Sequence, residues 1–209
     1  MTTAVYVEQI NEIIEGQLKH LKETNPFFVK FPQKVQPSDL TWCSHLYHLS
    51  HHFAELLKVR WDRFQDAPHD VFSTHYQEEK DHPEMLREFM LGLGLKDPVH
   101  SRPSYETENF ISALYRAAAV MEDNLSLLII NSTAEKFAHM MYVHVLERLQ
   151  NSGMSNLTYW EVHTVADEEH SDVYHYLSNM NEQQVEEAKH LIKYTVYAID
   201  QMQRSWFAE

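Results

Sequence analysis

The sequence predicts an all-α protein. The chain has 209 residues, of which only four are Gly and seven are Pro, while 44% are hydrophobic. Long stretches lack both helix-breaking residues, and apolar residues recur every three or four positions, which is the period of a helix. A chain of this length can bury a full core as one unit, so we expect residues 1–209 to form a single helical domain.

The first half of the chain predicts two long helices. The first covers Ala4–Lys22 and ends at Asn25-Pro26, since the residue before a proline disfavours helical geometry. Residues 26–37 contain three of the seven prolines, which predicts an extended connection. Ser38 is expected to cap the second helix, which reaches about Gln65.

The second half predicts the remaining helices. One begins near His69 and is expected to kink or restart at Pro83. The others are expected over 106–123, 124–151, 158–175 and 182–207. The helix over 124–151 is apolar around nearly its whole circumference, which is typical of a helix at the centre of a bundle.

Charge and cysteine content exclude several classes of protein. The formal net charge of -14 makes phosphate backbones and anionic membranes poor partners, so we expect neither nucleic acid nor membrane binding. Cys43 is the single Cys, which excludes an internal disulfide and suits a reducing compartment. The N-terminal residues lack a signal-peptide pattern, and the most apolar stretch, Leu125–Ile130, is too short to span a bilayer. We therefore expect a cytoplasmic protein.

The segment 158–175 carries the strongest functional signal. His163, Asp167 and His170 fall at steps of four and three, and therefore share one helix face with Trp160 and Tyr174. Apolar residues flank this face, which predicts that it points inward. A buried carboxylate without a partner is costly, and a bound cation would supply the partner. The alternative is a core network in which these polar side chains satisfy one another.

Two further helices offer ligands of the same kind. Glu79 and His82 are three residues apart, a spacing that helical bundles use to bind iron or manganese, although such pairs also occur on solvated helix faces. Glu135 lies in the middle of the apolar helix, where a carboxylate needs a cation, a partner or a raised pKa. A simple contact between Glu135 and His139 is the alternative.

Together these residues form a set of three carboxylates and three imidazoles. Oxygen and nitrogen ligands suit iron or manganese, whereas structural zinc favours Cys and calcium favours oxygen alone. Six protein ligands would saturate a single ion, so a pair of metals fits better. The predicted ligands are Glu79, His82, Glu135, His163, Asp167 and His170.

A histidine-rich run in the second helix is a weaker candidate. His45, His48 and His52 share a face, and Glu55 follows His52 by three residues. This pattern permits a metal site, but a half-buried helix surface flanked by aromatic residues explains it better.

The six predicted ligands resemble the metal signature of the heme-oxygenase-like di-iron oxidases and oxygenases. The similarity lies in His163-x3-Asp167-x2-His170, preceded by a mid-helix Glu135 and by Glu79-x2-His82, and it covers most of the chain. It implies a heme-oxygenase-like bundle of about seven helices, two Fe(II) ions per chain with manganese as an alternative, and O2 as cosubstrate. One iron would take Glu79, His82 and His170 or a close permutation, Glu135 would bridge, and His163 and Asp167 would hold the second iron.

Two departures from the family pattern affect the first ligand helix. Other members place a Glu seven positions before the ligand His, where this chain has His75. Glu78 is also an alternative to Glu79. The ligand contributed by this helix is therefore open between His75, Glu78 and Glu79.

The resemblance implies a non-heme di-iron oxidoreductase that uses O2 to oxidise a small molecule. Substrates in this family are often derived from amino acids or fatty acids, and outcomes include N-oxygenation, desaturation, carbon-carbon cleavage and oxidative rearrangement. Glu79, Glu135, His163 and Asp167 would act in catalysis. Candidate pocket residues are Tyr76, Trp160 and Tyr174, followed by Phe27, Phe28 and Phe72, although a core position explains each of these better.

Three other functions stay open. The wider superfamily includes TenA-like aminopyrimidine hydrolases and pyrroloquinoline quinone synthase, so a metal-independent hydrolase or oxidase is one alternative. Cys43 is the sole thiol and lies on the wrong helix for TenA-like chemistry. A ferritin-like iron-binding protein is the second alternative, although His163 has no role in it. The third is a helical scaffold. Beyond the small-molecule substrate, an external reductant and a homodimer are both compatible with the sequence.

Overall fold

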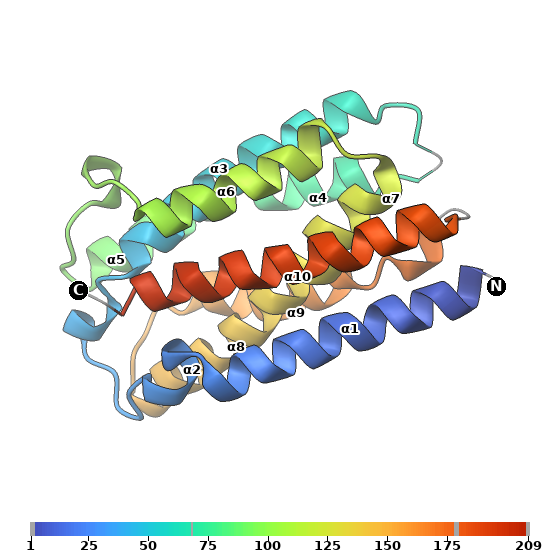
Figure 1. Ribbon diagram of the computed structural model, residues 1–209. Coiled ribbons are helices and arrows are strands. Elements are labelled where there is room, and N and C mark those ends of the chain that lie inside the picture. Colours follow the sequence, from blue (N-terminus) through green and yellow to red (C-terminus); the bar gives the residue numbers. More distant parts are fainter. Residues whose placement is uncertain (1–2, 68, 178–179, 208–209) are drawn as a thin grey trace.

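The computed structural model describes residues 3–67, 69–177 and 180–207, and every regular element in these ranges is helical, as predicted (Figure 1). The α-helices are α1 (Thr3–Thr24), α2 (Pro26–Lys30), α3 (Cys43–Arg63), α4 (Val71–Glu79), α5 (His82–Gly92), α6 (Tyr105–Ala119), α7 (Asp123–Ser126), α8 (Lys136–Asn151), α9 (Thr158–Ser171) and α10 (Glu182–Ser205). Short 3-10 turns are η1 (Pro37–Leu40), η2 (Pro98–His100) and η4 (Tyr174–Tyr176), and η3 (Leu127–Glu135) is a π-helix.

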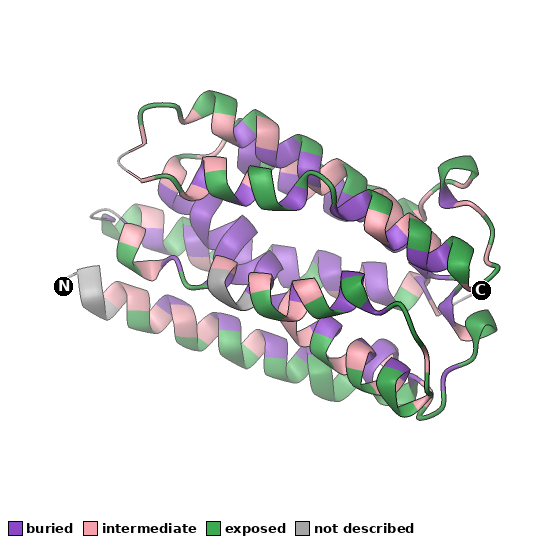
Figure 2. Ribbon diagram, turned by 180° about the vertical axis from the view of Figure 1, so that it is seen from behind, coloured by how far each residue is buried: buried purple, intermediate pink, exposed green. Residues whose placement is uncertain are grey.

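The long helices run roughly along one axis and bury their inner faces against each other (Figures 1 and 2). Helix α10 packs against α1 and α6, while α3 packs against α4, α5 and α6. Helix α9 packs against α8 and η3, and η3 also packs against α6 and α10, so η3 lies at the centre of the bundle. Apolar side chains from all of these helices join one core, which includes Ile14, Leu57, Leu128 and Ile199.

Local signals explain where several helices begin. The side chain of Asn181 accepts a hydrogen bond from the Gln184 backbone N–H, and the Gln184 side chain accepts one from the Asn181 N–H, which together form a capping box at the start of α10. Ser104 caps α6 by accepting from the Thr107 N–H at 3.2 Å. These caps satisfy backbone groups that would otherwise lack partners.

Two predictions for the first half of the chain are corrected by the structure. Residues 26–37 are not wholly extended, because Asn25 accepts from the Phe27 N–H at 2.8 Å and Pro26 opens the short helix α2. Ser38 caps no long helix; it lies in the 3-10 turn η1, and α3 begins at Cys43. By contrast, the predicted restart near Pro83 is confirmed, since α4 ends at Glu79 and α5 begins at His82.

The central helix differs from an ordinary α-helix. Residues Leu127–Glu135 form a π-helix, whose hydrogen bonds join residues five apart, and the Thr133 hydroxyl likewise donates to the Leu128 carbonyl at 2.8 Å. All nine residues of this segment are buried. The sequence predicted one apolar helix over 124–151, and the structure divides it into α7, η3 and α8. The π segment ends at Glu135, a predicted ligand.

The helix that carries the inward polar face is shorter than predicted. Helix α9 ends at Ser171, so Tyr174 lies in the turn η4 and not on the stripe of His163 and Asp167. The Tyr174 hydroxyl donates to the Asn11 side chain at 2.8 Å, on α1. Within the described ranges, no helix combines the length and apolar character needed to cross a membrane.

Candidate metal centre

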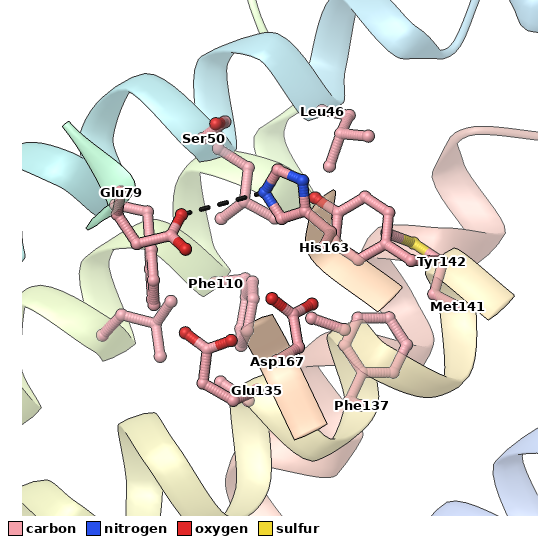
Figure 3. Close-up of a pocket in the computed structure, with 15 residues that line it drawn as sticks. Leu46, Ser50, Glu79, Phe110, Glu135, Phe137, Met141, Tyr142, His163 and Asp167 are labelled. Carbon is pink, nitrogen blue, oxygen red and sulfur yellow. Dashed lines mark ion pairs between the residues drawn. The ribbon is translucent and has the colours of Figure 1, made fainter. Parts of the chain in front are cut away.

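The six predicted ligands meet inside the bundle. Glu79 is the last residue of α4, His82 is the first residue of α5, Glu135 ends η3, and His163, Asp167 and His170 lie on α9. Five of these side chains are buried, and the side chain of His170 is 10% exposed. Figure 3 shows Glu79, Glu135, His163 and Asp167 pointing toward one another from three different elements.

Each element presents its side chain for a local reason. The spacing of four and three residues on α9 brings His163, Asp167 and His170 to one face, as predicted. The break between α4 and α5 lets Glu79 and His82 approach each other from two helix ends, with Pro83 in the first turn of α5, where its missing N–H costs nothing.

Glu79 lies at the middle of the cluster. Its Oε2 atom is 2.9 Å from His82 Nδ1 and 3.8 Å from His163 Nε2, and its Oε1 atom is 3.8 Å from His170 Nδ1. Potential ligand atoms of Glu79, His82 and His163 lie within 4.8 Å of one another, and the same holds for Glu79, Asp167 and His170. Glu79 therefore belongs to both groups of potential ligands.

Several buried atoms at this centre have no hydrogen-bond partner among the described residues. They are Glu79 Oε1, both carboxylate oxygens of Asp167, and His170 Nδ1. Leaving such groups unpaired in a protein interior costs several kcal/mol when they are charged. A bound cation would satisfy all of these atoms at once, so the donor set fits a metal centre of oxygen and nitrogen ligands.

Two of the imidazoles have the hydrogen-bond pattern of a metal ligand. His163 Nδ1 lies 2.7 Å from the Tyr159 carbonyl, which only accepts, so Nδ1 carries the proton and the Nε2 lone pair faces Glu79. His170 Nε2 lies 2.6 Å from the Glu78 carboxylate, so Nε2 donates and the Nδ1 lone pair faces the cluster. Ligand histidines generally donate their second ring N–H to an acceptor in this way.

The electrostatics of the centre reflect the crowding of buried negative charge. Burial raises the pKa of the Glu135 carboxyl to about 7. Burial, with the negative charges of Glu135 and Glu79 nearby, also holds the pKa of Asp167 well above its ordinary value. Burial alone would raise the pKa of Glu79, but the adjacent His163 and His82 outweigh it and hold that pKa well below the ordinary value. A cation would relieve the repulsion among the three carboxylates.

The structure distinguishes the alternatives on the first ligand helix by their positions. Glu79 is buried in the cluster, whereas the Glu78 side chain is 51% exposed and contacts His170 from outside. His75 is 1% exposed, and its Nε2 atom is 2.8 Å from Glu135 Oε1. The six predicted ligands do not include His75, which the sequence left open as an alternative because it lies seven residues before His82.

A pocket of about 50 Å³ lies beside the carboxylates and His163. Its apolar walls include Leu46, Leu49, Phe53, Phe110, Phe137 and Met141, from α3, α6 and α8. Figure 3 shows Phe110, Phe137 and Met141 around the same opening as Asp167. The pocket thus joins an apolar surface to the polar centre.

The residues predicted from sequence to line a substrate pocket lie elsewhere. Trp160 is fully buried among Trp42, Phe89 and Tyr142, while Tyr76 stacks on Trp61 with 5.6 Å between ring centroids. Tyr174 contacts Asn11 on α1. Phe27, Phe28 and Phe72 are also members of the core. Sequence periodicity identified these aromatic residues as inward-facing, but it could not separate the core from a pocket.

The histidine-rich run of α3 lies apart from the metal centre. His48 contacts the Ser101 hydroxyl at 3.0 Å, and His52 contacts Glu55 at 2.8 Å with both side chains exposed. None of the groups of potential ligands found in the described part of the chain includes these residues. This placement agrees with the surface interpretation that the sequence favoured.

Comparisons with known proteins agree on fold and family. A model of a family described as iron-containing redox enzymes matches residues 40–200. A solved structure from Shewanella denitrificans OS217, described as a domain of unknown function with a heme oxygenase-like fold, has a TM-score of 0.76 and is 16% identical in sequence. This likeness covers 96% of the present chain and 91% of the other, and it shows that the all-α bundle is heme-oxygenase-like. No curated protein matched the sequence.

Proposed function

The chain belongs to the family of iron-containing redox enzymes, and from this premise we propose that it is a non-heme di-iron oxidase or oxygenase that uses O2 to oxidise a small molecule. The observation that carries the proposal is the set of buried, unpartnered ligand atoms on Glu79, Asp167 and His170. The Nδ1 atom of His170, with its lone pair, is one of these atoms, and the Nε2 lone pair of His163 faces the same space.

We propose that the protein holds one ion with Glu79, His82 and His163, and the second with Asp167, Glu135 and His170. Glu79 would be the shared carboxylate, because among the described residues it is the one carboxylate that belongs to two of the groups of potential ligands. The resemblance had implied Glu135 in that role. Three carboxylates offset three of the four positive charges of two Fe(II) ions, which suits a buried centre.

When bound, the iron pair would supply the electrons that reduce O2, and this chain's side chains would prepare the surroundings. Phe53, Phe110 and Phe137 exclude water from the space beside Asp167 and give it an apolar surface. A substrate derived from an amino acid or a fatty acid would place an alkyl segment there. N-oxygenation, desaturation and carbon-carbon cleavage are the reaction classes compatible with this arrangement.

The metal-independent enzyme and the ferritin-like iron-binding protein have less support as alternatives. A cysteine nucleophile is disfavoured because Cys43 is fully buried, and burial raises the pKa of its thiol far above the ordinary value. A ferritin-like centre would give His163 no role, whereas His163 Nε2 faces Glu79 within the cluster.

The first test is an anaerobic Fe(II) titration followed by Mössbauer spectroscopy and by absorbance measurements after mixing with O2. We expect about two irons per chain and an O2-dependent change in absorbance, both lost in His163→Ala. His48→Ala is the matched control, because it removes a partly buried imidazole outside the centre. A wild-type protein without stoichiometric iron, or a His163→Ala variant that behaves like wild type, would refute the proposal.

A further inference from the structure

His75 lies within metal-binding distance of the centre, yet its partners differ from those of the other histidines. Potential ligand atoms of His75, Glu135 and His170 lie within 4.8 Å of one another, so distance alone would permit an ion among them. On its far side, His75 Nδ1 is 2.8 Å from Arg60 Nη2 and 3.3 Å from Asn131 Nδ2. Arg60, His75 and Asn131 are all buried.

The chemistry of these partners fixes where the His75 proton lies. A guanidinium group has only donors, so Nδ1 must accept from Arg60. The Asn131 amide is oriented independently, because its Oδ1 accepts from Arg60 Nη1 at 2.7 Å and its Nδ2 donates to the His170 carbonyl at 2.9 Å. The nitrogen that Asn131 turns toward His75 is therefore also a donor. Two donors face Nδ1, so this atom carries a lone pair.

The ring of His75 is neutral, because an Nδ1 atom that keeps its lone pair toward two donors excludes the doubly protonated imidazolium. A neutral imidazole with a lone pair on Nδ1 has its proton on Nε2. Nε2–H then donates to Glu135 Oε1 at 2.8 Å. Arg60 keeps its charge at neutral pH even though burial lowers its pKa to about 9, so the arrangement persists.

We propose that His75 is not a metal ligand but a positioning residue, which holds the Glu135 carboxylate through an Nε2–H donor that Arg60 and Asn131 fix in place. The inference rests on the proposed di-iron function and extends it by giving a role to an imidazole that lies within ligand distance of the centre but stays outside the ligand set. To bind an ion through Nε2, His75 would need its proton on Nδ1, directly against the guanidinium donor. His163 and His170 show the opposite pattern, since their outer nitrogens meet acceptors.

Three substitutions test the role of His75 in the iron-binding protein. His75→Gln keeps both hydrogen bonds in principle, because the amide oxygen accepts from Arg60 and the amide nitrogen donates to Glu135. We expect it to retain about two irons per chain with wild-type Mössbauer parameters. His75→Leu removes the donor and should weaken iron binding about 10–100-fold, as is usual for partners of metal ligands. The same Gln substitution at His163 should abolish stoichiometric iron binding.

A measurement on the metal-free protein tests the proton position independently of any function. In a long-range 1H–15N spectrum, the His75 signals are identified by their loss in His75→Gln, and we expect a protonated Nε2 and an unprotonated Nδ1. An unprotonated Nε2, or a His75→Gln variant that loses iron as His163→Gln does, would overturn the inference. If the wild type binds no iron while Nε2 is protonated, the di-iron function fails but the assignment of the His75 proton stands.

Discussion

Replacing Glu135 by Gln should stabilise the metal-free protein at alkaline pH. Glu135 is 3% exposed, and burial raises its pKa to about 7 from an ordinary value of 4.5. Because the pKa of this carboxyl is higher in the folded state, its neutral form contributes to stability. This contribution is fully present below about pH 4.5 and is lost as the pH rises through about 7. Gln mimics the neutral acid at every pH, and its amide oxygen still accepts from His75.

The size of this effect follows from the pKa of Glu135. At about 1.4 kcal/mol for each pH unit between the two pKa values, the buried charge costs up to about 3 kcal/mol at pH 8. With a urea dependence of about 2 kcal/mol per M for a protein of this kind, the unfolding midpoint of Glu135→Gln should lie about 1–2 M above that of the wild type. At pH 4.5 the two midpoints should nearly coincide.

The assay is urea unfolding of chelator-treated protein between pH 4.5 and 8. Glu147→Gln, which changes an exposed glutamate on α8, is the matched control and should show no such pH dependence. In the presence of saturating Fe(II), the wild type should have the higher unfolding midpoint. An amide coordinates iron poorly, so iron binding stabilises only the wild type. Parallel pH profiles for the wild type and Glu135→Gln would refute the assignment of a buried, repelled carboxylate.

Three further predictions address the pocket, the core and acid stability. Met141→Trp should fill the pocket and lower turnover of a small substrate while leaving iron stoichiometry unchanged, as measured by oxygen consumption and metal analysis; loss of iron would contradict it. Leu57→Ala, at a fully buried position, should lower the free energy of unfolding by about 2–5 kcal/mol in urea, and a loss under 1 kcal/mol would contradict the packing. Burial lowers the pKa of His144 to about 4, so its contribution to stability is present above about pH 6.5 and is lost as the pH falls through about 4. As the pH falls from about 6.5 to about 4, His144→Gln should therefore lose about 1–3 kcal/mol less of its free energy of unfolding than the wild type. An equal loss would contradict a ring that burial keeps neutral.

The parts of the fold that follow from helical period alone were predictable. The shared face of His163, Asp167 and His170 depends only on their spacing within one helix, and all three residues lie on α9. Helix boundaries that depend on more than one signal were not predictable. Asn25-Pro26, for example, ends α1 and also begins α2. The π-helix could not be recognised either, because an apolar segment has the same composition whether its bonds span four or five residues.

The partners of His75 illustrate a different limit. Its distance of seven residues from His82 makes His75 a visible candidate in the sequence, but the proton on its ring is determined by Arg60, on another helix. Similarly, helical period does not separate Trp160 in the core from Phe110 at the pocket, because both are inward-facing aromatic residues. Such distinctions depend on contacts between helices, which periodicity does not describe.

The π-helical segment has a consequence for how this protein tolerates change in length. Residues 127–135 form bonds five apart, so each hydrogen-bonded turn holds one residue more than in an α-helix. Deleting one residue between 127 and 134 would remove this extra residue, so an ordinary α-helix could form with Glu135 still directed toward α9. A single deletion in this segment should thus be tolerated more easily than one in α8, where each lost residue turns the rest of the helix by about 100°.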